Sequence, residues 1–136
     1  MKLKVGLFAE VKRAFTSEEV GIYCGYSEDV NPIHREKEAS QKNGFDDILV
    51  PGLLVSSLFG GLMGSELPGT GTIHLFQDVS FSRPVYVNEI VLARIEVIKI
   101  RSDKPIVTFA CIAKKNGTEE VVKGTAVVKV PKHFLA

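Results

Sequence analysis

The sequence has no tryptophan, only two cysteines and almost no excess of charge. Seventeen basic residues stand against 16 acidic ones with no basic run, so we do not expect a nucleic acid to be bound through its phosphates. Cys24 and Cys111 belong to no CxxC or Cys/His set, which predicts neither a disulfide nor a metal site. Residues 1–6 lack the long apolar core of a secretory signal, and a cytoplasmic location is the simplest expectation.

The sequence also lacks an apolar run long enough to cross a bilayer. Its most apolar segment, residues 51–67, falls short of the ~20 residues that a transmembrane helix needs. Gly60 and Gly64 have the spacing of a membrane dimer motif, but the segment is short and its flanks are polar. We therefore interpret it as a buried central helix and expect no membrane partner.

The length of 136 residues, 45% of them hydrophobic, suits a single domain over residues 1–136. Sequence patterns predict helices over 17–27, 35–42 (short and exposed) and 52–67, then alternation at 73–75 and 79–82 and three further strands near 89–101, 105–115 and 119–130. Asn116-Gly117 tolerates the positive φ of a tight hairpin turn, so the last two strands should pair antiparallel.

These elements predict an α+β fold in which an antiparallel β-sheet wraps around a long central α-helix. One face of such a sheet needs cover, and the apolar helix can provide it. This is the hot dog arrangement, although composition alone does not exclude another α+β layering. Its remaining sheet edge would be free to pair with a second copy, which predicts a homodimer.

The segment most suggestive of chemistry is residues 26–34, with the sequence YSEDVNPIH. It contains a carboxylate, Asp29, and an imidazole, His34, five positions apart with Pro32 between them. Proline disfavours helical geometry at the preceding residue, so the helix from residue 17 should stop and the chain should turn. Asp29 and His34 can then point into one space, as acid-base catalysis requires.

A structural interpretation of the same residues stays open. Asp, Asn and Pro are ordinary turn residues, and Asp29 or Asn31 could simply cap backbone donors. A lone histidine is also often a structural or solvated residue.

Four blocks in order resemble the MaoC-like (R)-specific enoyl-CoA hydratases. They are residues 26–34, VPGLL at 50–54, LPGTG at 67–71 and FSRPV at 81–85. The resemblance runs over nearly the whole chain and is greatest to the small single-domain members associated with polyhydroxyalkanoate and β-oxidation metabolism. It implies a hot dog homodimer that adds water reversibly to trans-2-enoyl-CoA of short to medium chain length, giving the (R)-3-hydroxyacyl-CoA.

The resemblance also implies roles for individual residues. Asp29 and His34 match the catalytic dyad of the family, and Asn31 between them would support it by orienting one of them or the water. CoA is part of the substrate, and no separate cofactor or metal is implied. The sequence departs from many relatives at Pro51, where they carry His, and from some at Gly60, where they carry Ser. Any contribution of those side chains is therefore absent here.

Addition of water to an enoyl thioester moves negative charge onto the thioester oxygen, which needs a fixed hydrogen-bond donor beside it. The N-terminus of the 52–67 helix offers backbone N–H groups, and we expect Gly52 to be the oxyanion donor through its backbone N–H. The alternative is that Pro51-Gly52 is only a helix entry. The acyl chain should run beside the central helix, and five apolar side chains could line its path, although each could instead be a core residue: Phe45, Ile48, Leu54, Leu67 and Phe81.

Three other functions remain possible at this point. A 3-hydroxyacyl-[acyl-carrier-protein] dehydratase would use the same dyad in the opposite direction. A non-catalytic acyl-CoA-binding module would be expected to lose a dyad residue, whereas Asp29 and His34 are both present. A hot dog thioesterase would direct water at the carbonyl carbon instead of C3.

Overall fold

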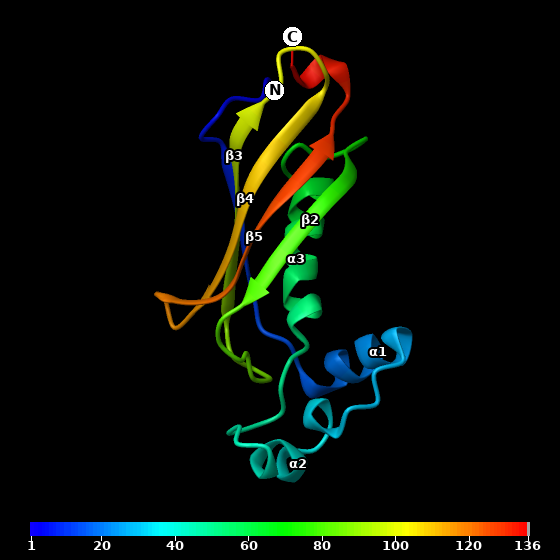
Figure 1. Cartoon of the computed structure of the whole chain (residues 1–136), viewed down its shortest axis with the longest axis vertical. Coiled ribbons are helices and arrows are strands. Elements are labelled where there is room, and N and C mark those ends of the chain that lie inside the picture. The colour runs from blue at the N-terminus through cyan, green and yellow to red at the C-terminus, as the bar shows by residue number, and fades with distance from the viewer. Residues whose placement is uncertain (136) are drawn as a thin grey trace.

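The computed structural model describes residues 1–135, and in this part of the chain five strands form one antiparallel sheet (Figure 1). The strands are β1 (Phe8–Arg13), β2 (Ile73–Phe81), β3 (Val91–Ile100), β4 (Ile106–Lys115) and β5 (Glu119–Lys129). Their spatial order is β1-β3-β4-β5-β2, which leaves β1 and β2 at the two edges. The alternation predicted at 73–75 and 79–82 lies within the single strand β2, and the three further predicted strands correspond to β3, β4 and β5.

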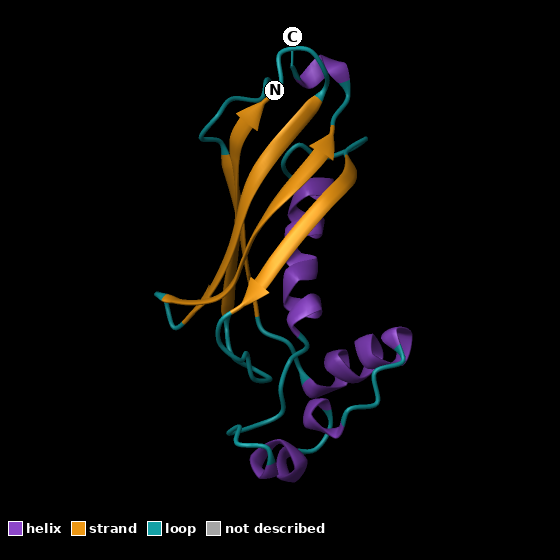
Figure 2. Ribbon diagram, viewed as in Figure 1, coloured by secondary structure: helices purple, strands orange, loops and turns teal. Residues whose placement is uncertain are grey.

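A long helix, α3 (Gly52–Ser65), lies along one face of the curved sheet, as Figure 2 shows. Its buried residues are Val55, Phe59, Leu62 and Met63, which recur at the spacing of one helical face. They pack against a sheet face that supplies Ile95, Val107, Phe109 and Val128, among other buried side chains. The predicted α+β arrangement, with the sheet around a central helix, is therefore confirmed. None of the helices in residues 1–135 is long and apolar enough to cross a membrane.

The hairpin between β4 and β5 is confirmed in its position. Asn116 and Gly117 both have positive φ, at 51° and 79°. Lys115 pairs with Glu119, so the connection has three residues, 116–118. It is therefore longer than the two-residue turn that Asn-Gly most often forms.

Strand β1 was not predicted. Its sequence, FAEVKR, is half charged, and only Ala9 and Val11 pack against the core. An edge strand with one covered face gives a weak hydrophobic pattern. The side chains of Ala9 and Val11, and of Leu7 just before the strand, nevertheless alternate toward the core.

The remaining short elements lie beyond the end of the sheet, near the N-terminus of α3 (Figure 1). They are α1 (Ser17–Ser27), a 3₁₀ turn (Pro32–His34) and α2 (Lys37–Lys42), while a second 3₁₀ turn (Lys132–Phe134) follows β5. Helix α1 has the predicted bounds because Thr16 caps it and forms a capping box with Glu19. Helix α2 begins two residues later than predicted, since the N–H groups of residues 35 and 36 bond back to Pro32.

Candidate active site

The turn that follows α1 is built from the side chains of Asp29 and Asn31. Helix α1 ends at Ser27, and the next residue, Glu28, has a φ of 59° that turns the chain away from the helix axis. Asp29 accepts the Asn31 N–H through Oδ1 at 3.0 Å, and Asn31 accepts the Ile33 N–H through its own Oδ1 at 3.3 Å. The capping roles that the sequence left open are therefore present. They occupy only one oxygen of the Asp29 carboxylate.

The other Asp29 oxygen faces the imidazole of His34. Asp29 Oδ2 lies 3.5 Å from His34 Nε2, longer than a good hydrogen bond. The His34 side chain is 12% exposed and that of Asp29 is 39% exposed, so the pair sits at the edge of solvent. The predicted convergence of Asp29 and His34 is thus present, and the separation allows one water molecule to hydrogen-bond both groups.

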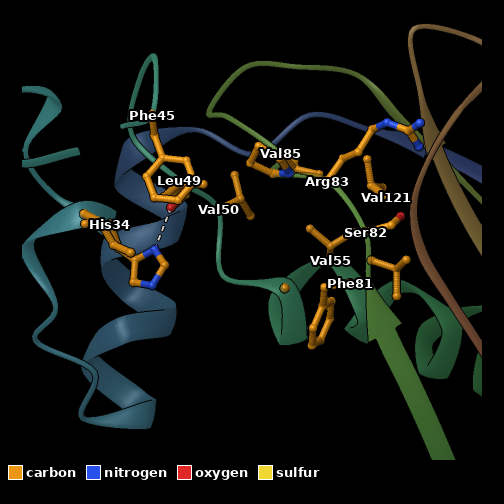
Figure 3. A pocket seen from close by; sticks show the side chains of 14 residues that line it. His34, Phe45, Leu49, Val50, Val55, Phe81, Ser82, Arg83, Val85 and Val121 are labelled. Atoms are coloured by element: carbon orange, nitrogen blue, oxygen red, sulfur yellow. Dashed lines mark hydrogen bonds between the residues drawn. The ribbon is translucent and has the colours of Figure 1, made fainter. Parts of the chain in front are cut away.

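A backbone carbonyl fixes the orientation of the His34 ring. His34 Nδ1 lies 2.8 Å from the Leu49 carbonyl oxygen (dashed line in Figure 3). A carbonyl can only accept, so Nδ1 carries the hydrogen and donates it. In the neutral ring, Nε2 then has a free lone pair directed toward Asp29. Sequence reasoning did not find Leu49, because the group that acts is its backbone oxygen and carries no side-chain signal.

His34 opens onto a cavity of about 440 Å³ at the N-terminal end of α3 (Figure 3). Its walls come from the 33–34 turn, the 45–55 segment, the 81–85 segment that follows β2, and β5. The lining residues are Ile33, His34, Phe45, Leu49, Val50, Gly52, Val55, Phe81, Ser82, Arg83, Pro84, Val85, Val121 and Val122. The wall is mainly apolar with a few polar groups, which is typical of a small-molecule site.

The structure brings only part of the predicted site to this cavity. His34, Phe45, Gly52 and Phe81 line it, and Asp29 lies beside it through its contact with His34. Three predicted lining residues lie elsewhere: Leu67 is buried in the core, Leu54 is half-buried against the core, and the Ile48 carbonyl accepts the Val87 N–H. These three do not line the cavity. Helical and apolar character alone could not separate core-facing from cavity-facing positions.

Gly52 begins α3, and within residues 1–135 its N–H donates to no acceptor. This donor at a helix N-terminus suits a developing negative charge. The space beside the Gly52 Cα is filled by a side chain of the protein itself. A Cβ built on Gly52 would lie 2.6 Å from two carbons of the Phe81 ring, which lies beside the start of α3 in Figure 3.

No metal site is evident in the described part of the chain: residues 1–135 contain no group of three or more His, Cys, Asp or Glu side chains placed to hold an ion. The polar groups around the cavity can instead move a proton at His34 and Asp29 and donate a hydrogen bond at Gly52.

Comparison with known proteins gives a consistent result. A family model described as a MaoC like domain matches residues 4–127. The (R)-specific enoyl-CoA hydratase of Aeromonas caviae is 41% identical over 129 residues, covering 95% of this chain and 96% of that protein. A mitochondrial 3-hydroxyacyl-[acyl-carrier-protein] dehydratase of Arabidopsis thaliana is 37% identical, covering 88% of this chain and 72% of that protein.

Solved structures agree with the sequence relatives. The structure of an (R)-hydratase from A. caviae involved in PHA biosynthesis matches with a TM-score of 0.92 at 41% identity, covering 95% of this chain and 98% of that chain. An unliganded R-hydratase from Pseudomonas aeruginosa matches with a TM-score of 0.89 at 28% identity, covering 95% and 83% of the two chains.

Proposed function

The chain belongs to the family of MaoC-like domains, and we propose that it is a hydro-lyase that adds water reversibly to trans-2-enoyl-CoA to give (R)-3-hydroxyacyl-CoA. The observation that carries this proposal is the Asp29–His34 pair, 3.5 Å apart beside an apolar cavity. The relatives of this chain include both an (R)-specific enoyl-CoA hydratase and a 3-hydroxybutyryl-CoA dehydratase. These names describe the two directions of one reaction type.

The dyad can perform the proton transfers of this reaction without another group. His34 Nε2 takes one proton from the water as the water oxygen bonds to C3 of the enoyl chain. Asp29 accepts a hydrogen bond from the second O–H of the same water and so holds the water oxygen in place. Electrons of the double bond move toward the thioester, and C2 then takes the proton back from Nε2. Hydroxyl and hydrogen are both delivered from one face, and His34 returns to its neutral form.

The intermediate charge is stabilised at the start of α3. As the water oxygen attacks C3, negative charge moves onto the thioester oxygen, and the Gly52 N–H at the positive end of the helix dipole donates to it. The Asn31 side chain has a supporting role only, because its oxygen caps the 3₁₀ turn. Its backbone N–H nevertheless holds Asp29 Oδ1 and so orients the carboxylate.

The substrate enters through the 440 Å³ cavity, with Phe45 and Phe81 beside the acyl chain. A cavity of this volume is in the lower part of the range for small-molecule sites and suits short to medium acyl groups. The carrier can be CoA or the acyl carrier protein, since relatives of both kinds are similar to this chain. A 3-hydroxyacyl-[acyl-carrier-protein] dehydratase is therefore the second candidate function. Competition between the two carriers distinguishes them.

A homodimer is the assembly that the free sheet edge supports. Edge strand β2 carries three large apolar side chains outside the cavity that each expose more than half of their surface: Ile73, Leu75 and Phe76. The opposite edge, β1, carries Glu10, Lys12 and Arg13, and charged side chains discourage pairing of an edge. A second copy would therefore pair through β2 about a two-fold axis. A cytoplasmic location stays a prediction of the sequence, to be checked by cell fractionation.

Substitution of the dyad tests the proposed chemistry. Asp29→Asn keeps the shape of the side chain and removes its charge, and His34→Gln removes the basic Nε2. Each should lower the turnover of crotonyl-CoA by about a hundredfold or more, the scale of positioned acid-base groups. His133→Gln is the matched control, because His133 lies in the 3₁₀ turn after β5 and should leave turnover unchanged. Near-normal turnover in a folded Asp29→Asn or His34→Gln protein would remove the assignment.

A further inference from the structure

Lys115, the last residue of β4, is a buried lysine outside the cavity. Its side chain is only 8% exposed. The ammonium donates to the Pro84 carbonyl oxygen at 2.7 Å and to Glu89 Oε1 at 3.1 Å. A buried ammonium is unfavourable unless it is paired in this way, so the side chain holds both partners in place.

Both partners belong to the loop between β2 and β3, which forms one wall of the cavity. Pro84 itself lines the cavity, together with Ser82, Arg83 and Val85. Glu89 Oε1 also accepts the Tyr86 N–H at 2.7 Å. Lys115 therefore joins the two ends of the 84–89 loop, and its ammonium is one of the groups that hold this loop in position.

The same loop is bonded to the segment that orients His34. Val50 donates to the Val85 carbonyl at 2.8 Å, and Val87 donates to the Ile48 carbonyl at 3.0 Å. These two bonds lie on either side of Leu49, which forms an isolated antiparallel bridge with Tyr86. The Leu49 carbonyl is thus held in register by the loop that Lys115 fixes.

Tyr86 gives a second connection between the lysine and this segment. Its ring centroid lies 5.2 Å from Lys115 Nζ, within the range of a cation–π contact. Its hydroxyl accepts the Asp46 N–H at 3.1 Å. The ammonium therefore acts on residues 46–50 through a side chain as well as through the backbone.

From these contacts we propose that Lys115 is a positioning residue for His34. It fixes the 84–89 loop, the loop fixes the Leu49 carbonyl, and this carbonyl sets the Nδ1–H tautomer that leaves Nε2 free as a base. The catalytic consequence rests on the proposed hydratase function. The consequence for the tautomer of His34 is independent of that function.

The test compares Lys115→Met with Lys114→Met. Methionine keeps the unbranched apolar part of the side chain and removes the ammonium. Lys114 is the adjacent residue of β4 and makes none of these contacts within the described residues. In Lys115→Met, turnover of crotonyl-CoA per folded molecule should fall by about ten- to a hundredfold, since displacements of about 1 Å can have effects of this size. Lys114→Met should behave as the wild type.

The ¹⁵N chemical shifts of the His34 ring give a readout that a merely structural role would not move. The chain has three histidines, so His74→Gln and His133→Gln assign the signals. Wild-type His34 should show the Nδ1–H tautomer, and Lys115→Met should show a mixture with Nε2–H. If Lys115→Met does not fold, Glu89→Gln keeps the acceptor for Tyr86 N–H, removes the charge and should shift His34 in the same direction.

Two results would overturn the positioning role. One is a folded Lys115→Met protein with wild-type turnover and an unchanged His34 tautomer. The other is an Nε2–H tautomer already present in the wild type. If the wild type does not hydrate crotonyl-CoA but the tautomer changes as expected, the proposed function fails and the positioning role stands.

Discussion

Gly52→Ala should damage activity more than stability, because the space for the new methyl group is occupied by the Phe81 ring. The added Cβ would lie 2.6 Å from two ring carbons, whereas carbon atoms normally pack at about 3.5–4.0 Å. The ring must therefore move by about 1 Å. Phe81 is 52% exposed, so its side chain can rotate away without disturbing the core.

The expected magnitudes follow from this displacement. Moving a side chain off its preferred rotamer costs about 0.5–1.5 kcal/mol, so the free energy of unfolding should fall by about 1 kcal/mol. The displaced ring also changes the cavity that it lines and the surroundings of the Gly52 N–H. A displacement of about 1 Å at such a site can lower the rate by up to about a hundredfold. We expect kcat/KM to fall ten- to a hundredfold, about 1.4–2.7 kcal/mol in the barrier.

The assay is crotonyl-CoA hydration by Gly52→Ala, Phe81→Ala and the double variant, with urea unfolding alongside. Removing the ring should restore part of the activity lost in Gly52→Ala, giving a coupling free energy of at least about 1 kcal/mol. Gly61→Ala is the control, since a Cβ at this glycine in the middle of α3 meets nothing within 4 Å. Equal activity of Gly52→Ala and Gly61→Ala, or strict additivity with Phe81→Ala, would show that contact with the Phe81 ring is not the cause.

Two further predictions concern the core and the sheet edge. Burial raises the pKa of the Cys111 thiol from its usual 9.0 to about 11. As the pH rises, the unfolded state therefore loses the thiol proton before the folded state does. The contribution of this thiol to the free energy of unfolding is fully present below pH 9 and should decrease by up to about 3 kcal/mol by pH 11. Urea unfolding should show a shallower alkaline decline in Cys111→Ala, and parallel pH profiles would contradict the cause. In sedimentation equilibrium, the wild type should have twice the 14.9 kDa mass of the chain. Leu75→Glu, which places a charge on the exposed apolar surface of β2, should be monomeric. A monomeric wild type would exclude the β2 dimer.

The elements that could be predicted from the sequence are those whose local signals agree with their tertiary environment. Thr16 and Glu19 form the capping box at the start of α1, and Asn116-Gly117 adopts the positive φ values of the β4–β5 turn. Helix α3 is apolar because it faces the whole sheet. Strand β1 was missed because a half-exposed edge strand buries too few side chains to give a clear pattern.

The site was predictable in its side-chain chemistry but not in its geometry. The turn residues placed Asp29 and His34 near each other, since Glu28 ends α1 and Asn31 caps the 3₁₀ turn that begins at Pro32. Which apolar residues line the cavity depends on the direction in which each side chain points, and Leu67 is buried in the core. The Leu49 carbonyl and the Phe81 ring on Gly52 are tertiary contacts between distant segments, and no local pattern in the sequence encodes them.

The proposed hydratase activity is tested by mixing the purified wild-type protein with crotonyl-CoA, following the loss of the conjugated enoyl absorbance, and determining the configuration of the product. We expect the wild type to form (R)-3-hydroxybutyryl-CoA and Asp29→Asn to lose this activity. Release of free CoA would instead indicate a thioesterase. Formation of the (S) product, or no turnover of crotonyl-, hexenoyl- or octenoyl-CoA, would contradict the proposed reaction.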